Sequence, residues 1–334
     1  MKKKILFRVD AGEKVGLGHF YRSHNLALAL KNKGYLVTFV HEKSNFWDVI
    51  TDFEFQHLGL DSNNTNNNMF DVCLKGKYRI LYVDGVLEFD EENIKKLKGK
   101  TKVVFYQNIS QSRHLADVFI LPSIHQENLF FEKFNTANTL VFQGLEYFTF
   151  NSKIIKLTTK QISPSNTIKS IGIICGGSDP RNVMLSVFKL IDYNVWYTVS
   201  FNFYYGDNYM HQNSIPKKYA ENVSFLSYDV KSISKNDVLI AAFGVSTYEF
   251  MALGMPIISV GHQKANANAS KILEEKTKSI YHLGLIDFLT KEVLNETISK
   301  FVSDITISQK LSEKSKQILD LKGIDRIVRI IENI

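Results

Sequence analysis

Short apolar runs alternate along the chain with longer segments in which apolar and polar residues mix. The apolar runs are rich in β-branched and aromatic residues, as buried strands are, and the mixed segments are typical of helices that bury one face. This alternation favours parallel sheets with crossover helices. In the first half it predicts strands at residues 4–9, 36–41, 79–83, 102–106 and 118–121, with helices at 21–33 and 91–97.

The pattern starts again in the second half. A strand at 170–175, a glycine turn and a helix at 182–192 come first, and they are followed by strands at 195–203, 223–226, 238–242, 257–260 and 279–282. Two halves that each open with a strand and a glycine turn form a weak internal repeat. The predicted fold class is therefore α/β, with two Rossmann-like domains facing each other across a cleft.

The domain boundaries follow from this repeat. Residues 1–150 are predicted to form an N-terminal α/β domain, 151–169 a polar connection, and 170–334 a C-terminal nucleotide-binding domain whose last helix packs back on the first domain. The asparagine-rich stretch at 61–68 is predicted to be a mobile polar loop. Ligands of open α/β sheets bind beyond the carboxyl ends of the strands, so we expect the substrate between the two domains.

Composition narrows the partners. The 334 residues carry a net charge of +7, which favours anionic ligands such as nucleotides, or a peripheral contact with an acidic membrane surface. Nucleic acid is not an expected partner, because no zinc-finger spacing, RNA-recognition motif or basic helix occurs. Cys73 and Cys175 are far apart in apolar surroundings, which indicates a reducing cytoplasm rather than a disulfide framework. We expect no signal peptide and no transmembrane segment.

The most informative motif follows the first predicted strand. Asp10 ends that strand, and Gly16, Gly18, His19 and Arg22 come next, at the start of a predicted helix. A glycine turn before a helix leaves backbone N–H groups free to bind an anion, and a histidine beside it can act as a general base. Arg22 shares a helix face with His19. Asp10 either orients His19, contacts a sugar hydroxyl or bonds loop N–H groups, and the motif alone could also be a plain turn.

Two further turns resemble ligand loops. Each follows a predicted strand of the second half and precedes a helix, so each could bind phosphate through N–H groups or could simply be a turn with an N-cap. A glutamate on the same short helix suits a ribose diol, and a glutamine after the next strand could line the same site. The candidate nucleotide-binding residues here are Gly176, Gly177, Ser178, Gly244, Ser246, Thr247, Glu249 and Gln263.

These motifs together resemble the PseG/SpsG family of nucleotide-sugar enzymes, relatives of MurG in the GT-B superfamily. The resemblance spans the whole chain. It includes a Gly-x-Gly-His-x-x-Arg element, a mid-chain Gly-x-x-Tyr that ends at Tyr147, and a Gly-Gly-Ser-Asp turn. It also includes a Gly-x-Ser-Thr-x-Glu stretch and the tail at 323–328.

The resemblance implies a UDP-sugar hydrolase of pseudaminic-type acid biosynthesis. Water would attack the anomeric carbon, with His19 as the catalytic histidine and UDP as the leaving group. No cofactor or metal is expected, because backbone donors and helix ends can stabilise the leaving diphosphate. The sequence departs from the family at Asp84-Gly85-Val86, where family hydrolases carry Asp-His-Tyr, and at Gln107-Asn108, where they carry an acidic pair. We interpret these changes as losses of polar groups from the sugar side of the cleft.

Two alternatives follow from that departure. One is a GT-B glycosyltransferase that uses a nucleotide sugar for a surface polysaccharide or a flagellar glycan. The other is a non-catalytic nucleotide-sugar-binding protein. The residues proposed for chemistry do not separate hydrolysis from glycosyl transfer, because a neutral imidazole can accept a proton from water or from an acceptor hydroxyl.

Overall fold

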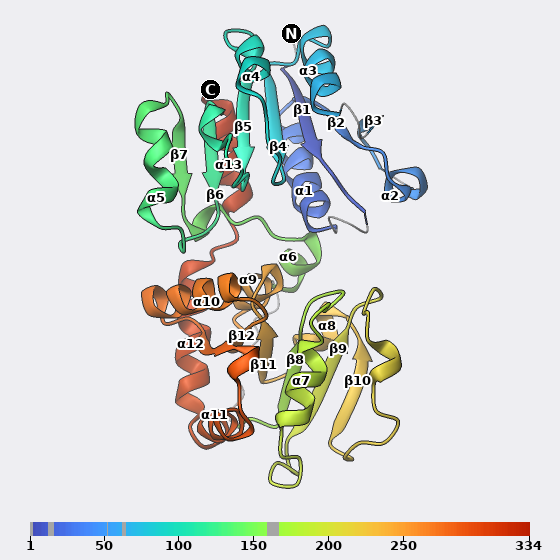
Figure 1. Ribbon diagram of the computed structural model, residues 1–334, viewed down its shortest axis with the longest axis vertical. Coiled ribbons are helices and arrows are strands. Elements are labelled where there is room, and N and C mark those ends of the chain that lie inside the picture. Colours follow the sequence, from blue (N-terminus) through green and yellow to red (C-terminus); the bar gives the residue numbers. More distant parts are fainter. Residues whose placement is uncertain (1–2, 13–16, 52, 62–64, 159–166) are drawn as a thin grey trace. The chain divides into compact units, whose positions relative to one another are not determined.

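Two parallel sheets organise the chain in this computed structural model, which describes residues 3–12, 17–51, 53–61, 65–158 and 167–334. The seven-stranded sheet has the order β3-β2-β1-β4-β5-β6-β7, and the six-stranded sheet has the order β10-β9-β8-β11-β12-β13 (Figure 1). Every strand pairing in them is parallel. The predicted α/β class with two parallel sheets is confirmed.

The first sheet shows why its central strands are easy to recognise. The residues of β4 and β6 are all buried, because helices cover both faces of the sheet, and such strands consist of continuous apolar runs. The two edge strands are largely exposed and were not predicted. The strands are β1 (Lys4–Val9), β2 (Leu36–Glu42), β3 (Gln56–Leu60), β4 (Ile80–Asp84), β5 (Lys102–Tyr106), β6 (Val118–Leu121) and β7 (Leu140–Gln143).

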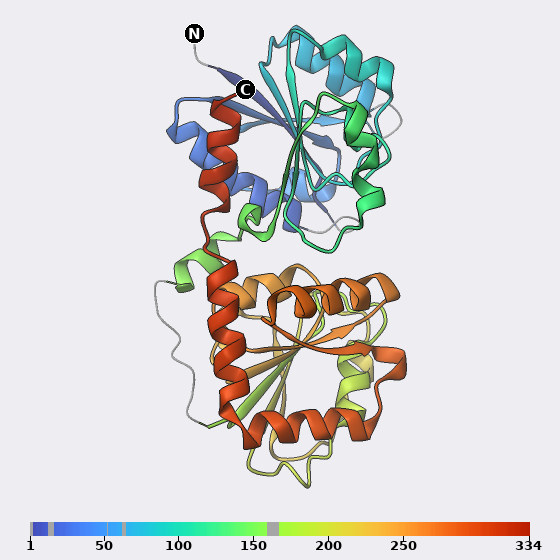
Figure 2. The same cartoon turned by 90° about the vertical axis from the view of Figure 1, so that its left-hand side faces the viewer.

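Helices cover the two faces of the first sheet. α1 (Gly18–Asn32) and α13 (Gly323–Glu332) bury Leu26 and Ile327 in one core, and Figure 2 shows α13 beside the sheet. α3 (Thr65–Lys75) and α4 (Glu91–Leu97) bury Phe70 and Ile94 in the other core. The remaining helices are α2 (Asn45–Val49), α5 (Asn128–Phe131) and the 3₁₀ turns η2 (Arg113–Leu115), η3 (Glu132–Thr136) and η4 (Leu145–Tyr147).

The second sheet has the same construction. One core of this sheet includes apolar residues of α7 (Val183–Leu190), α11 (Lys291–Ser303) and α12 (Ile305–Ile318). Two further helices contact the sheet: α9 (Val245–Ala252) contacts β11 and β12, and α10 (Lys264–Thr277) contacts β12 and β13. The strands are β8 (Ser170–Ile174), β9 (Ser200–Tyr205), β10 (Val223–Ser227), β11 (Val238–Ala242), β12 (Ile257–Gly261) and β13 (Tyr281–Leu285). The short elements are α8 (Val230–Ile233), η5 (Gln212–Ser214) and η6 (Ile286–Phe288).

The chain forms two compact units that differ from a simple division in sequence. One unit comprises Met1–Ser152 together with Leu321–Ile334, and the other comprises Lys153–Asp320. The last helix, α13, therefore belongs to the first unit, where it packs against α1. The chain crosses between the units twice, after Ser152 and before Leu321.

Four predicted elements need correction. Residues 65–68 are the first turn of α3 rather than part of a polar loop, because Met69, Phe70 and Cys73 anchor this helix to the sheet; positions 62–64 lie outside the described residues. Within the predicted connection, α6 (Ser152–Thr158) buries Ile154, and positions 159–166 are not described. The predicted strand at 195–203 begins only at Ser200, and the one at 279–282 is shifted to Tyr281–Leu285 beside a register irregularity in β12.

Candidate functional site

The topology of the first sheet brings the ends of β1 and β4 together. These neighbouring strands lie at the point where the strand order reverses, and open α/β sheets bind ligands beyond the carboxyl ends of the strands at such a switch point. His19 stands in the first turn of α1, which follows β1, and Asp84 is the last residue of β4. Gly18 begins α1, whereas Gly16 lies outside the described residues.

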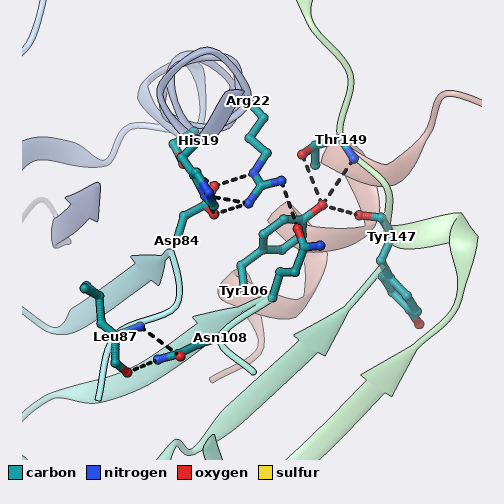
Figure 3. Close-up of polar contacts among 10 residues, drawn as sticks. His19, Arg22, Asp84, Leu87, Tyr106, Asn108, Tyr147 and Thr149 are labelled. Carbon is teal, nitrogen blue, oxygen red and sulfur yellow. Dashed lines mark hydrogen bonds and ion pairs between the residues drawn. The ribbon is translucent and has the colours of Figure 1, made fainter. Parts of the chain in front are cut away.

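Four polar side chains form one network at this point (Figure 3). His19 Nδ1 lies 2.8 Å from Asp84 Oδ1. Arg22 donates from Nε to Asp84 Oδ2 at 2.6 Å and from Nη2 to Asp84 Oδ1, so the guanidinium grips both carboxylate oxygens. Ser23 Oγ donates to Asp84 Oδ2 at 2.8 Å. Asp84, which was not among the predicted site residues, is the centre of the network.

Helical spacing explains why three of these residues converge. His19, Arg22 and Ser23 are three and four positions apart, and such residues lie on one face of a helix. That face points at the end of β4. Arg22 and Asp84 are buried, whereas the His19 side chain keeps 29% of its surface exposed. The network therefore presents a single reactive group, the imidazole, to solvent.

The charges in the network are fixed. Burial alone would raise the pKa of Asp84, but Arg22 and His19 outweigh it and hold that pKa well below its usual range. Burial likewise would lower the pKa of Arg22, and the Asp84 carboxylate raises it above the ordinary value. Both groups stay ionised at any physiological pH, so they form a neutral pair.

This charge state selects one tautomer of His19. An ionised carboxylate only accepts hydrogen bonds, so Nδ1 donates to Asp84. Arg22 Nη2 lies 2.8 Å from the same nitrogen, but a protonated Nδ1 cannot accept a bond from it. In the neutral ring Nε2 then carries the lone pair. A histidine oriented in this way by a buried carboxylate is prepared to act as a general base.

The two residues interpreted as losses on the sugar side point into the protein instead. Gln107 Oε1 accepts a hydrogen bond from Arg22 Nη1 at 2.9 Å. Asn108 is completely buried, and its amide bonds the backbone nitrogen and oxygen of Leu87 at 3.2 and 2.9 Å. That interpretation is wrong for the completely buried Asn108, whereas for Gln107, beside Arg22, it stays a prediction. Gln107 supports Arg22, and Asn108 fixes the loop that follows Asp84.

Asp10 and Tyr147 have other contacts than His19. Asp10 accepts from Arg8 Nη2 at 2.8 Å and from the backbone nitrogen of Glu42 at 2.7 Å, so it joins the ends of β1 and β2. This is the backbone-bonding alternative for Asp10, and Asp84 makes the contact that orients His19. The ring of Tyr147 packs near Phe142 and points away from the network (Figure 3).

The second sheet has its own switch point, between β8 and β11. Gly176, Gly177 and Ser178 follow β8 and are exposed. Gly176 has a φ of +85°, which glycine adopts without strain. The next loop comes so close that a Cβ on Gly206 would lie 2.6 Å from the Gly177 oxygen. The turn is therefore held in place and keeps its backbone accessible, as an anion-binding loop requires.

The polar residues that follow β11 form two groups, one with a structural role and one near Tyr228. Thr247 is completely buried, and its hydroxyl accepts a hydrogen bond from the backbone nitrogen of Gly244 at 3.1 Å, so it shapes the turn. Ser246 and Glu249 lie near Tyr228, the first residue after β10. The Tyr228 hydroxyl bonds Ser246, and burial together with the charge of Glu249 raises the pKa of Tyr228.

Glu249 differs electrostatically from Asp84. Burial raises the pKa of Glu249 to about 7. Tyr228 was not predicted as part of this site, and burial raises the pKa of its phenol to about 12, so it stays protonated. Gln263, exposed at the start of α10, follows the neighbouring strand β12. The structure thus gathers Ser246, Glu249 and Tyr228 and leaves Thr247 in a structural role.

Solved structures with the same architecture decide the fold. MurG of Acinetobacter baumannii superposes with a TM-score of 0.69 at 15% identity, covering 99% of this chain and 100% of MurG. The chain has the GT-B fold. A UDP complex of Staphylococcus aureus MnaA superposes at 0.65 with 14% identity over 99% and 96% of the two chains. A glycosyltransferase from Rickettsia africae superposes at 0.66 with 15% identity over 99% and 98%.

Sequence relatives of this GT-B protein are distant. No protein-family model matches the chain. Uncharacterized protein MJ1062 of Methanocaldococcus jannaschii is 26% identical over 271 residues, which cover 76% of this chain and 55% of that protein. The chain thus spans about half the length of this relative. The spore coat polysaccharide biosynthesis protein SpsG of Bacillus subtilis is 21% identical over 346 residues, covering 97% of this chain and 96% of SpsG.

Two negative findings concern only the described part of the chain. None of its helices is long and apolar enough to cross a membrane. Its His, Cys, Asp and Glu side chains form no group of three or more that could hold a metal ion.

Proposed function

We propose that this GT-B protein is a glycosyltransferase that uses a UDP-sugar in the synthesis of a surface polysaccharide. The observation that carries the proposal is the His19–Asp84 pair, a base with a fixed tautomer at a ligand-binding switch point. Similarity along nearly the whole chain to a spore coat polysaccharide biosynthesis protein supports the pathway class. Solved GT-B structures that include a glycosyltransferase and a UDP complex support the substrate class.

In this proposal the first unit supplies the base. His19 Nε2 takes the proton of an acceptor hydroxyl while the oxygen attacks the anomeric carbon of the sugar. The bond between that carbon and the diphosphate oxygen breaks, and UDP leaves with the electron pair. Asp84 stabilises the imidazolium that forms, and Arg22 keeps Asp84 ionised throughout.

The second unit would hold the nucleotide. The exposed N–H groups of residues 176–178 suit the diphosphate, because they are fixed donors that follow a strand at the switch point. Glu249 would accept hydrogen bonds from the ribose hydroxyls, and Ser246 and Gln263 line the same edge. Fixed donors of this kind stabilise the charge that develops on the leaving diphosphate.

Hydrolysis is the second candidate, and the motif around Gly18, His19 and Arg22 favours it through its resemblance to sugar-nucleotide hydrolases. The same Nε2 would then deprotonate water. The residues after Asp84 distinguish the candidates in part. Gly85 and Val86 replace a polar pair, and 60% of the Val86 side chain is exposed beside the network. An apolar border suits an acceptor better than a water-activating pocket.

The test is incubation with a panel of UDP- and CMP-sugars in ¹⁸O-water, analysed by mass spectrometry with and without hydroxyl acceptors. Transfer predicts nucleotide release that depends on the acceptor and a glycosylated product. Hydrolysis predicts release without any acceptor and ¹⁸O in the free sugar, since C–O cleavage puts the water oxygen on the anomeric carbon. A protein that binds UDP and turns over no sugar in either arm would be a binding protein, and the proposal would be wrong.

A further inference from the structure

Two segments of the first unit connect it to the second unit, and they contact each other within the first unit. The chain leaves after Ser152 and returns at Leu321. A Cβ added to Gly323 would lie 2.1 Å from the backbone oxygen of Phe148, so the returning segment has no room for a side chain at this position. The two crossing segments are therefore fixed to each other.

Hydrogen bonds from two helices attach the outgoing segment as well. Asn25, on α1, donates from Nδ2 to the backbone oxygen of Phe150 at 2.9 Å. Arg326, on α13, donates to the backbone oxygen of Glu146 at 3.0 Å. Since α1 also carries His19, the helix of the candidate base is bonded directly to the segment that leads out of the unit.

Tyr106 makes the third attachment, and its hydroxyl is saturated. It donates to the backbone oxygen of Tyr147 at 3.2 Å, because a carbonyl only accepts. It accepts from the backbone nitrogen of Thr149 at 3.3 Å and, with its own proton committed, from Thr149 Oγ1 at 3.2 Å (Figure 3). Tyr106 and Thr149 are both buried. Removing this hydroxyl would take a hydrogen-bond partner from three polar atoms, two of which belong to the buried Thr149.

The ring of the same residue supports the candidate site. The guanidinium carbon of Arg22 lies 5.0 Å from the centroid of the Tyr106 ring, within the range of a cation–π contact. The next residue, Gln107, has a φ of +54°, a left-handed conformation that non-glycine residues rarely adopt. This turn lets consecutive residues place a ring and an amide on Arg22. Such strain persists only where its surroundings enforce it.

We propose that Tyr106 is a positioning residue that ties the His19–Asp84–Arg22 network to the path of the outgoing segment. The ring holds Arg22, Arg22 holds Asp84, and Asp84 orients His19, while the hydroxyl holds Tyr147 and Thr149. A change in that path on nucleotide binding is thereby transmitted to the imidazole. The inference rests on the proposed function, because it requires a nucleotide to bind the second unit.

The first test compares Tyr106→Phe with Tyr35→Phe. Both remove one buried hydroxyl from the first unit, but the Tyr35 hydroxyl has no hydrogen-bond partner among the described residues. For Tyr106→Phe we expect kcat to fall about tenfold, the scale of a small misplacement of reacting groups, with the UDP dissociation constant unchanged. Tyr35→Phe should change neither. Equal kcat values for the two variants would overturn the proposal.

Variants of Thr149 provide the same test if Tyr106→Phe does not fold. Thr149→Val removes the hydroxyl that bonds Tyr106 and keeps the shape of the side chain, and Thr149→Ser keeps the hydroxyl. We expect Thr149→Val to lower kcat and Thr149→Ser to restore it. A loss of kcat in both variants to the same extent would mean that packing, not the hydroxyl, matters, and the proposal would fail.

A measurement without turnover separates this inference from the proposed function. In protein labelled at the histidine rings, His19→Asn identifies the His19 resonance among the nine histidines. Adding UDP should move that resonance in the wild type and in Tyr35→Phe, and move it much less in Tyr106→Phe. If calorimetry detects no UDP binding, the proposed function fails. If UDP binds and the His19 resonance responds equally in all three proteins, the coupling through Tyr106 is wrong.

Discussion

The two switch points of this molecule occupy equivalent places in their sheets, but the first is formed mainly by side chains and the second mainly by backbone. The first, between β1 and β4, consists of buried side chains whose charges are already paired: Asp84 is gripped by Arg22 and contacts His19. The second, between β8 and β11, includes the exposed backbone of Gly176 and Gly177 and the carboxylate of Glu249. The side chains of the first site bond one another, whereas the second exposes backbone donors to solvent.

Their electrostatics follow from this difference. The pKa of Asp84 is lowered because a cation compensates for its burial, whereas the pKa of Glu249 is raised to about 7 because burial acts on it without such a partner. A preorganised pair suits chemistry, since nothing has to reorganise when charge develops on the imidazole. An uncompensated acceptor suits binding, since a ligand relieves its cost. The comparison supports the proposed placement of the base in the first unit and of the nucleotide in the second.

The largest expected effect comes from breaking the first pair. Asp84→Asn removes the charge and leaves Arg22 buried without a counter-ion, which should destabilise the first unit by about 3–5 kcal/mol. His19 also loses its fixed tautomer, so kcat should fall by about 10²–10⁴-fold. Urea unfolding and steady-state turnover measure the two effects.

A matched control for Asp84→Asn is Asp117→Asn in the same unit. Asp117 pairs with the exposed Lys102 at the surface, so its loss should cost no more than about 1 kcal/mol and leave kcat unchanged. An Asp84→Asn protein as stable and active as the control would remove Asp84 from the centre of the site.

Replacing the base itself should separate catalysis from stability. His19→Asn keeps a group that can bond Asp84 but removes the proton acceptor. We expect kcat to fall by about 10²–10⁴-fold, with UDP affinity and unfolding free energy unchanged, because the imidazole is partly exposed and contacts no nucleotide in the proposed mechanism. Single-turnover kinetics and calorimetry check this. Loss of nucleotide binding with the rate intact would instead make His19 a phosphate ligand.

In the first sheet, the central strands, which are buried on both faces, could be predicted from the sequence, whereas the two exposed edge strands were missed. β4, β5 and β6 are nearly continuous apolar runs and were recognised. Gln56–Leu60 mixes polar residues and a glycine with two leucines, and Leu140–Gln143 is apolar but only four residues long, so neither was recognised. The helix over residues 65–68 was missed for a related reason. Its asparagines carry no pattern, and what holds it is Phe70 and Cys73 against the sheet, a tertiary contact.

The candidate site could also be predicted from the sequence only in part. His19 and Arg22 could be found from local spacing on one helix, because the motif and the face it forms are contiguous in sequence. Their partner could not, because Asp84 joins them only through the pairing of β1 with β4, 62 or more positions away. The position of Asp84 at the end of an apolar strand was the available signal. Tyr106 and Tyr228 had no such signal, since their roles depend on the loops they contact.

Glu249→Gln should change binding and stability in opposite directions. The loss of a charge-assisted hydrogen bond to ribose should weaken UDP binding by about 1–3 kcal/mol. Because the folded state raises the pKa of this carboxyl from 4.5 to about 7, the folded protein binds its proton more tightly than the unfolded chain does. Its burial therefore costs stability increasingly as pH rises from 4.5 to 7. The variant should melt at a higher temperature than the wild type at pH 8, without ligand, and not at pH 4.

Glu275→Gln is the control for this pair of effects. Glu275 is exposed in the same unit and pairs with Lys271, so neither UDP affinity nor the pH dependence of melting should change. If Glu249→Gln binds UDP as tightly as this control does, Glu249 lies outside the nucleotide site.

Lowering the pH should change the stability of the two units differently, because the first unit contains a buried histidine, His41. His41 Nδ1 donates to the backbone oxygen of Glu42 at 2.9 Å, and its Nε2 lies 3.1 Å from His57 Nδ1, from which a neutral His41 accepts a hydrogen bond. The His41 ring also stacks on Trp47, with centroids 3.9 Å apart. Burial disfavours the charged ring and lowers the pKa of His41 from 6.5 to about 4.

The smallest predicted effect follows from that histidine. The unfolded chain takes up the His41 proton near pH 6.5 and the folded protein only near pH 4, so the first unit should lose stability as pH falls between these values. Glu249 gives the second unit the opposite trend over part of this range. With Trp196→Phe, emission from Trp47 follows the first unit alone. In His41→Asn, whose amide can still donate to Glu42, the acid sensitivity of the Trp47 signal should decrease. An unchanged pH dependence would show that other groups control the acid response of this unit.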